Sequence, residues 1–227
     1  MLDMEFRILY WLQELRSPAL DQAMEAITHL GDKGWFFILL GAALFFIPRT
    51  RRAGTAVLLS LLCGMIVGNL CLKNLVMRPR PCWIDASVPL LIPVPHDYSF
   101  PSGHTLAAFE TAVSICLVNR KWGTAFLIFA ALVGLSRMYL FVHFPTDVLS
   151  GAALGIFIAW FVKKGIEKYR LCDILRVQKT RKQSRGSGVK CRLDRELPAG
   201  RKRDFQKLLC GRFPASRCIL GIYCCFS

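Results

Sequence analysis

The sequence predicts an all-α fold: a polytopic membrane helix bundle with five to six spans, an N-terminal amphipathic helical pair and a disordered basic tail. Three observations support this prediction. Of the 227 residues, 54% are hydrophobic, and long runs between residues 34 and 162 carry almost no charge. Lys and Arg cluster at alternate ends of these runs. Finally, eighteen of the 30 Lys and Arg residues follow residue 162 against five acidic residues, so +13 of the net charge of +15 belongs to the tail.

Residues 1–31 are expected to form amphipathic, interfacial helices. Within residues 4–15, apolar side chains recur at helical spacing and charged side chains lie between them. The Ser17-Pro18 pair ends this segment and starts another helix. Residues 18–30 carry three ionisable side chains and are short for a membrane span. An interfacial helical pair is therefore favoured, with a short or tilted first span as the alternative.

Five apolar segments follow and make up a membrane core over residues 32–168. They cover residues 34–48, 53 to about 77, 105–118, 123 to about 142, and 146–162. Each is near the length needed to cross about 30 Å of hydrocarbon. The clusters RTRR, RK and KK mark the ends that the positive-inside rule places in the cytoplasm. The other ends then face outward from the cell membrane.

Residues 169–227 form a basic tail that contains six of the ten cysteines. Hydrophobic periodicity stops here, so we expect disorder on the cytoplasmic side, near anionic lipid headgroups. No nucleic-acid-binding pattern accompanies the charge, so no nucleic-acid partner is expected. Cysteines in a reducing compartment and in apolar runs predict no structural disulfide.

Three polar clusters lie at the outward ends of the apolar segments: KNLVMRPRP (73–81), PSGH (101–104) and SRMYLFVHFPTD (136–147). In the first, Lys73 and Arg80 are two helical turns apart, which in a continuous helix places them on one face. Pro79 and Pro81 are expected to end the helix between them. Arg80 could hold a phosphate through two parallel N–H bonds and Lys73 through its charge. The alternative is cations that reach the lipid interface, which we favour for Arg78.

The PSGH cluster begins the third apolar segment. A helix N-terminus offers unpaired N–H groups and a partial positive charge, which suits a phosphate. Ser102 could add a hydroxyl donor, and Gly103 lets the backbone approach the ligand. His104 could then protonate a departing alkoxide. The alternative is an ordinary helix start with an interfacial histidine.

The third cluster joins a cation, an imidazole and a carboxylate. Arg137 lies near the outward end of the fourth segment, where a buried cation needs an anionic partner. Pro145 fits the first turn of the last helix, which puts Asp147 in its N-terminal turn. Asp147 could hold one nitrogen of His143 and leave the other free to attack phosphorus. The alternative is a plain helix cap, with His143 facing headgroups.

Together the clusters resemble the three-part signature of the type-2 phosphatidic acid phosphatase superfamily, which includes the vanadium haloperoxidases and the glucose-6-phosphatase group. The resemblance covers roughly residues 30–165 and is carried by Lys73-x6-Arg80-Pro81, Pro101-Ser102-Gly103-His104 and Ser136-Arg137-x5-His143-x3-Asp147. It implies a lipid phosphate phosphatase with a phosphohistidine intermediate and no metal or other cofactor. It implies His143 as nucleophile, Asp147 as its partner and His104 as general acid. It also implies a phosphate site made by Lys73, Arg80, Ser102, Gly103 and Arg137.

The expected substrate is a lipid phosphate in the bilayer. An outward-facing site suits recycling of a polyprenyl carrier, so polyprenyl pyrophosphate ranks first, before phosphatidate and phosphatidylglycerophosphate. Two other interpretations stay open: a non-catalytic membrane adaptor with a lipid-binding tail, and a metal site made by His104, His143 and Asp147. The sequence leaves the oligomeric state open.

Overall fold

The computed structural model describes residues 2–186, and the side-chain surroundings of residues 2–168. The chain divides into two units, Met1–Leu171 and Cys172–Ser227, and the predicted site lies within the first. Every regular element of the described residues is helical. In chain order these elements are α1 (Leu2–Glu14), α2 (Pro18–Leu30), the 3-10 turn η1 (Asp32–Gly34), α3 (Trp35–Phe46), α4 (Arg51–Gly64), the π-helical η2 (Met65–Leu72), α5 (Lys73–Val76), α6 (Pro81–Ile84), α7 (Gly103–Cys116), α8 (Arg120–Tyr139) and α9 (Pro145–Gly186).

Three helical stretches are long and apolar enough to cross a membrane, namely Arg51–Ile84, Arg120–Tyr139 and Pro145–Lys168. A fourth is counted if α2 and the following η1–α3 stretch, bent by 41° at their junction, are one span. The all-helical membrane fold is confirmed at this level. The predicted number of five to six spans remains a prediction, because α3 and α7 are short helices of 12 and 14 residues.

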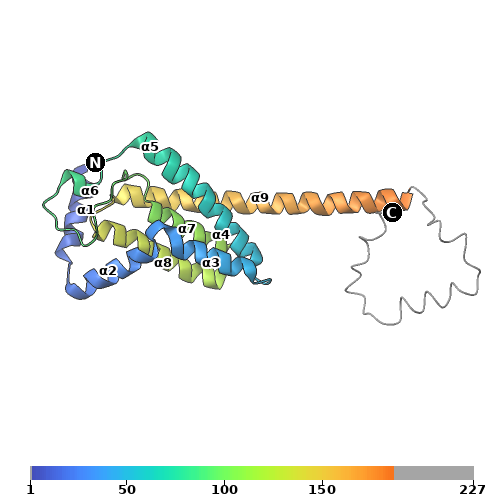
Figure 1. Cartoon of the computed structure of the whole chain (residues 1–227), viewed down its shortest axis with the longest axis horizontal. Helices are drawn as coiled ribbons and strands as arrows, with labels where there is room; N and C mark the ends of the chain where they lie inside the picture. The colour runs from blue at the N-terminus through green and yellow to red at the C-terminus, as the bar shows by residue number, and fades with distance from the viewer. Residues whose placement is uncertain (1, 187–227) are drawn as a thin grey trace, which may run out of the picture. The chain divides into compact units, whose positions relative to one another are not determined.

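Helix α7 lies among other helices, with α4 on one side and α8 on another (Figure 1). Helix α9 approaches α7 closely because two of its residues are glycines. A Cβ on Gly151 would lie 2.8 Å from the carbonyl oxygen of Ser102, and one on Gly155 would lie 2.8 Å from that of Leu106. The backbone N–H of Ser102 donates to the carbonyl of Asp147 at 3.1 Å. This packing places the second and third polar clusters side by side.

The turn between α8 and α9 is fixed by an apolar cluster. Val142 and Phe144, which flank His143, are both fully buried. The ring of Phe144 packs edge-on against Phe6 of α1, with 5.4 Å between ring centroids. An aromatic pair of this kind contributes about 0.5–1.5 kcal/mol beyond the area that it buries. The amphipathic α1 therefore supports the turn that carries His143.

The helix that carries Lys73 ends earlier than its prolines predict. Helix α5 stops at Val76, Met77 adopts a left-handed backbone conformation with φ of 48°, and Arg80 is extended before Pro81 begins α6. Lys73 and Arg80 therefore meet through a turn of the chain and not through one helical face.

Helix α9 runs past the predicted end of the membrane core. Residues 169–186, which the sequence analysis assigns to a disordered tail, are helical in the structure. The physical reason is composition: no Pro or Gly occurs between residues 166 and 185, and good helix formers such as Leu, Arg, Lys and Gln fill this stretch. The rest of the predicted tail lies outside the described residues.

Candidate active site

Most of the predicted site residues line one cavity of about 370 Å³. They come from the α4–α6 stretch, the start of α7, the end of α8 and the turn before α9. Those that line it are Lys73, Arg80, Gly103, His104, Arg137 and His143. Asp147 and Ser102 are fully buried behind this wall. Segments more than 60 residues apart in the chain thus meet at a single cavity, as the three motifs predict.

The cavity wall is strongly cationic. Lys73, Arg80 and Arg137 keep only 8%, 2% and 3% of their surface exposed. The Nη1 atom of Arg137 donates to the hydroxyl of Thr28 at 2.5 Å, whereas its Nε has no hydrogen-bond partner among the described residues. Buried cations are costly unless an anion compensates them. The wall is therefore suited to an anionic ligand.

In the structure, the carboxylate of Asp97 binds to two of the three cations in this wall. It accepts hydrogen bonds from Lys73 Nζ and, at 2.7 Å, from Arg80 Nη2, and its side chain is 55% exposed. Burial alone raises the pKa of Asp97, but the hydrogen bond and charge of Lys73, with the charge of Arg80, hold it well below its usual range. The Asp97 carboxylate thus binds, as an anion, to Lys73 and Arg80, two residues that are predicted to bind phosphate. Sequence reasoning missed it, although an acid four residues before PSGH was an available signal.

His143 presents one nitrogen to the cavity in acceptor form. Its Nε2 lies 3.1 Å from Nη1 of Arg80, and because a guanidinium can only donate, Nε2 must accept. The ring proton is therefore assigned to Nδ1. Burial, followed by the charges of Arg80 and Arg137, lowers the pKa of His143 well below its ordinary value. The imidazole is then neutral at neutral pH, the form that a nucleophile requires.

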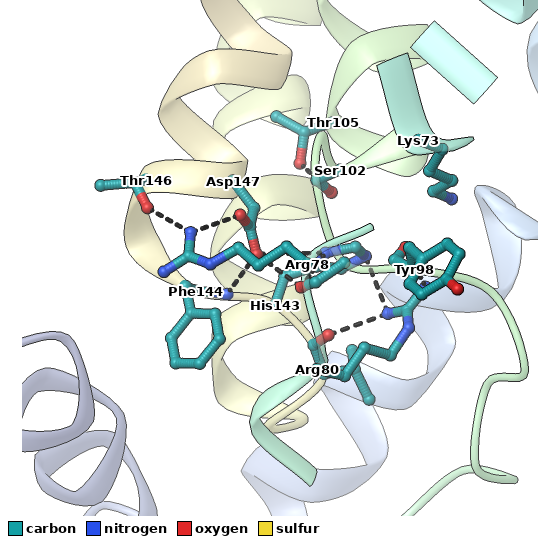
Figure 2. A network of polar contacts seen from close by, with 12 residues as sticks. Lys73, Arg78, Arg80, Tyr98, Ser102, Thr105, His143, Phe144, Thr146 and Asp147 are labelled. Carbon is teal, nitrogen blue, oxygen red and sulfur yellow. Dashed lines mark hydrogen bonds and ion pairs between the residues drawn. The ribbon is translucent and has the colours of Figure 1, made fainter. Parts of the chain in front are cut away.

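Asp147 reaches His143 through a serine that the sequence analysis did not single out. The Nδ1 atom of His143 is 3.8 Å from Oδ2 of Asp147, which is too long for a hydrogen bond, but 3.3 Å from Oγ of Ser99. The Ser99 hydroxyl donates to Asp147 Oδ2 at 2.5 Å. Figure 2 shows this buried network of polar contacts. The position of Ser99, two residues before PSGH, was the only signal for it.

Arg78 corrects one interpretation from the sequence. It does not reach for the lipid interface but bonds to Asp147 Oδ1 and Thr146 Oγ1, both at 2.6 Å (Figure 2). It also bonds to Glu5 Oε2 at 2.5 Å. Its guanidinium also lies 4.1 Å from the ring centroid of Phe144. The reason for the error is distance in sequence, because Glu5 lies 73 residues before Arg78. Arg78 therefore binds Oδ1 of Asp147, the carboxylate oxygen that does not accept from Ser99.

His104 is held at the cavity by the segment between α2 and α3. Its Nε2 lies 3.1 Å from Oδ1 of Asp32, whose other oxygen bonds to Nδ1 of His29 at 2.7 Å. A Cβ on Gly31 would lie only 2.4 Å from Cδ2 of His104, so a glycine is needed for the chain to pass this close. Sequence reasoning also missed Asp32, because an acidic residue between Gly31 and Gly34 is typical of an ordinary turn.

Ser102 and Gly103 are placed differently from each other. Gly103 begins α7 and lines the cavity, where the free N–H groups of the helix start are available. The Ser102 hydroxyl instead pairs with Oγ1 of Thr105 at 2.9 Å (Figure 2). Donation from Ser102 to a phosphate, as the motif implies, therefore requires rotation of this hydroxyl.

Comparison with known proteins agrees with this geometry. The family model of the PAP2 superfamily matches residues 53–170. The chain is 32% identical to phosphatidylglycerophosphatase B of Bacillus subtilis over 172 residues, covering 69% of this chain and 80% of the relative. It is 30% identical to the undecaprenyl-diphosphatase BcrC of Bacillus subtilis, covering 75% and 84%. The crystal structure of Aquifex aeolicus LpxE superimposes with a TM-score of 0.64 at 28% identity, covering 71% and 95%.

The predicted superfamily and the predicted phosphatase class are thereby confirmed. With its helical membrane fold and its cationic cavity around His143, the chain belongs to the PAP2 superfamily, and within it to the phosphatases.

Proposed function

We propose that this phosphatase hydrolyses a lipid phosphate or pyrophosphate through a phosphohistidine on Nε2 of His143, without a metal ion. The observation that carries the proposal is the acceptor nitrogen of His143, which faces a cavity walled by three buried cations. Among residues 2–168, no three His, Cys, Asp or Glu side chains gather as metal ligands do. Cations and backbone N–H groups therefore take the role of binding phosphate oxygens.

The first step transfers the phosphoryl group to the enzyme. An incoming phosphate displaces the Asp97 carboxylate and takes its place on Lys73 and Arg80. Arg137 binds a further oxygen through its Nε, which no side chain or backbone group of the described residues engages. Nε2 of His143 forms a bond to phosphorus as the bond to the leaving oxygen breaks. The positive charge that develops on the ring is stabilised through Nδ1–H, Ser99 and Asp147. His104, which enters this step as the imidazolium paired with Asp32, gives a proton to the leaving oxygen and becomes neutral.

The second step returns the enzyme to its starting state. Water attacks the phosphohistidine and the P–N bond breaks. His104 accepts a proton from this water, which replaces the proton that His104 gave up in the first step. Orthophosphate leaves, and Nε2 regains its lone pair. Asp32 supports both steps because it holds His104 at the cavity in either protonation state.

For the substrate, we propose polyprenyl pyrophosphate first, supported by the similarity to an undecaprenyl-diphosphatase. Phosphatidylglycerophosphate and phosphatidate are the alternative, supported by the similarity to a phosphatidylglycerophosphatase. We further propose a multi-pass protein of the cell membrane with the site facing outward and the tail in the cytoplasm. Support comes from the positive clusters at residues 49–52, 120–121 and 163–164, which mark the opposite ends of the helices.

The experiment is phosphate release by the purified full-length chain in detergent with excess EDTA. Undecaprenyl pyrophosphate, phosphatidylglycerophosphate and phosphatidate are compared for the wild type and for His143→Ala. We expect hydrolysis by the wild type, a loss of about 10³-fold or more in the variant, and an acid-labile phosphoenzyme in the wild type alone. Absence of hydrolysis by the wild type on all three lipids would support the adaptor interpretation. Full activity of His143→Ala would refute the phosphohistidine on this residue, and loss of wild-type activity in EDTA would support a metal site.

A further inference from the structure

A second, larger cavity of about 740 Å³ continues from the phosphate site along the helices, and it is called the groove below. It shares Lys73, Asp97, Gly103 and His104 with the first cavity. From there it extends between α4 and α7, where its wall is mainly apolar: Leu58, Leu61, Leu62, Met65, Leu106 and Ala107. If His143 attacks a lipid phosphate as proposed above, this groove is where the rest of the lipid lies. The inference below rests on that proposed function.

The groove contains a carboxyl group that the catalytic scheme does not use. Glu110 of α7 lines it with only 1% of the residue exposed, and its Oε1 has no hydrogen-bond partner among the described residues. The facing residue of α4 is Gly64, where a Cβ would lie 2.1 Å from that oxygen. Gly64 thus leaves room for the carboxyl between the two helices.

An unpartnered carboxylate inside a membrane protein is costly, so the neutral acid, which carries an O–H donor, is favoured. A donor in a hydrocarbon groove needs an acceptor from elsewhere, because an unmade buried hydrogen bond costs free energy. The ligand that fills this groove is therefore expected to supply an acceptor at the level of Glu110.

A second unpartnered polar group lies nearer the phosphate site. The side-chain amide of Asn69 lines the same groove, and its buried Oδ1 has no partner among the described residues. That oxygen would be 2.8 Å from a Cβ on Gly103, so it lies beside the start of α7. Since the two ends of an amide are assigned from their partners, this group can present either its oxygen or its NH₂ to a ligand.

The spacing of these groups indicates the kind of lipid. Gly103 and Glu110 are seven residues apart on α7, which is about 10 Å along the helix, and the glutamate side chain leans back toward the helix start. Asn69 and Glu110 thus lie no farther from the phosphate site than a glycerol unit and its ester bonds can reach. A polyprenyl chain offers only hydrocarbon at this depth, whereas a diacylglycerol phosphate offers two ester carbonyls.

We propose that Glu110 and Asn69 form a polar subsite that binds the ester region of a glycerolipid phosphate, with the Glu110 O–H donating to an ester carbonyl. The subsite makes the chain competent for diacylglycerol phosphates, the second of the two substrate classes proposed above. It acts on substrate selection and takes no part in the bond-breaking step.

The test compares ester and ether forms of one lipid. Full-length wild type, Glu110→Gln and Glu110→Met are assayed in detergent with dioleoyl phosphatidate, its dioleyl ether analogue, undecaprenyl pyrophosphate and p-nitrophenyl phosphate. For Glu110→Met, kcat/KM for the diester should fall about 5- to 15-fold, the size of one hydrogen bond. It should stay within about twofold for the other three substrates, and Glu110→Gln should keep a preference for the ester because its amide can still donate.

Thr111→Val is the matched control, because Thr111 is a buried neighbour on α7 that does not line the groove and whose hydroxyl also lacks a partner within residues 2–168. It should not change the ratio of ester to ether hydrolysis. Equal rates of the wild type on the ester and the ether, or an equal loss by Glu110→Met on both, would overturn the subsite.

Thermal stabilisation by the same two lipids separates the two proposals, since it needs no turnover. A rise in Tm with the diester that exceeds the rise with the ether, and that Glu110→Met removes, supports the subsite even if no lipid is hydrolysed. Absence of hydrolysis then counts against the proposed function alone. Hydrolysis of all lipids with identical Tm shifts for ester and ether refutes the subsite and leaves the proposed function standing.

Discussion

Replacing Ser99 by Ala tests how Asp147 acts on His143. The substitution removes a hydroxyl that bonds to Asp147 at 2.5 Å and lies 3.3 Å from the ring Nδ1 of His143. Asp147 keeps its bonds from Arg78 and from the backbone N–H of Phe144, so its charge stays compensated. What disappears is the connection to the ring, because the remaining gap of 3.8 Å exceeds hydrogen-bond distance.

The size of the effect follows from this loss. A hydrogen bond to a charged group contributes about 1.5–3 kcal/mol, and at about 1.4 kcal/mol per factor of ten the phosphoryl-transfer step should slow about 10- to 150-fold. KM should stay within about twofold, because Ser99 does not line the cavity. The assay is single-turnover phosphate release, with the ¹⁵N shifts of the His143 ring as a second readout of which nitrogen carries the proton.

Ser114→Ala is the matched control for this prediction. Ser114 is also a fully buried serine, it pairs with Ser60 at 3.2 Å, and neither residue lines the cavity. Its loss should affect stability but not the His143 ring. If Ser99→Ala keeps its rate within about twofold, or slows only as much as Ser114→Ala does, then Asp147 acts directly on His143 and the serine bridge is wrong.

Three further predictions follow from the same network. Arg78→Met leaves Glu5 and Asp147 without their shared cation, so the unfolding free energy should fall by about 3–5 kcal/mol, measured by thermal unfolding. The pKa of His143 is lowered by burial and by nearby cations, so the folded chain should keep a neutral ring as the pH falls through 6.5, which ¹⁵N NMR reports. Asp97→Asn removes the anion that competes for Lys73 and Arg80, so orthovanadate should inhibit at several-fold lower concentration.

For each of these three predictions, one result would contradict the reasoning. A Glu5→Gln variant as destabilised as Arg78→Met would locate the cost in the carboxylate rather than in the cation. Because the unfolded chain protonates His143 near pH 6.5 and the folded chain does not, this residue should lower stability as the pH drops below that value. Ring protonation near pH 6.5 in the folded enzyme would contradict this. Weaker vanadate inhibition of Asp97→Asn would mean that Asp97 orders the cations instead of competing for them.

Much of the fold and the family were predictable from the chain because they depend on local patterns. Apolar runs of span-like length predict membrane helices, and each of the five runs contains a helix in the structure. The helix starts at Gly103 and Pro145 were readable because helix N-termini carry strong local signals. The three motifs singled out eight candidate residues, and six of the eight line one cavity.

Tertiary structure decided the partners of those residues. Ser99, Asp97, Asp32 and Arg78 gain their roles only when segments between 17 and 73 residues apart are brought together. Their residue types are ordinary for loops and interfaces, and no local pattern distinguishes a serine beside an imidazole from one in water. Hydrogen bonds reach about 3 Å, whereas sequence patterns report only which side chains share a helix face. The phosphatase family of this protein was thus predictable from its sequence, whereas the proton assignment on His143 depends on contacts that only the folded chain makes.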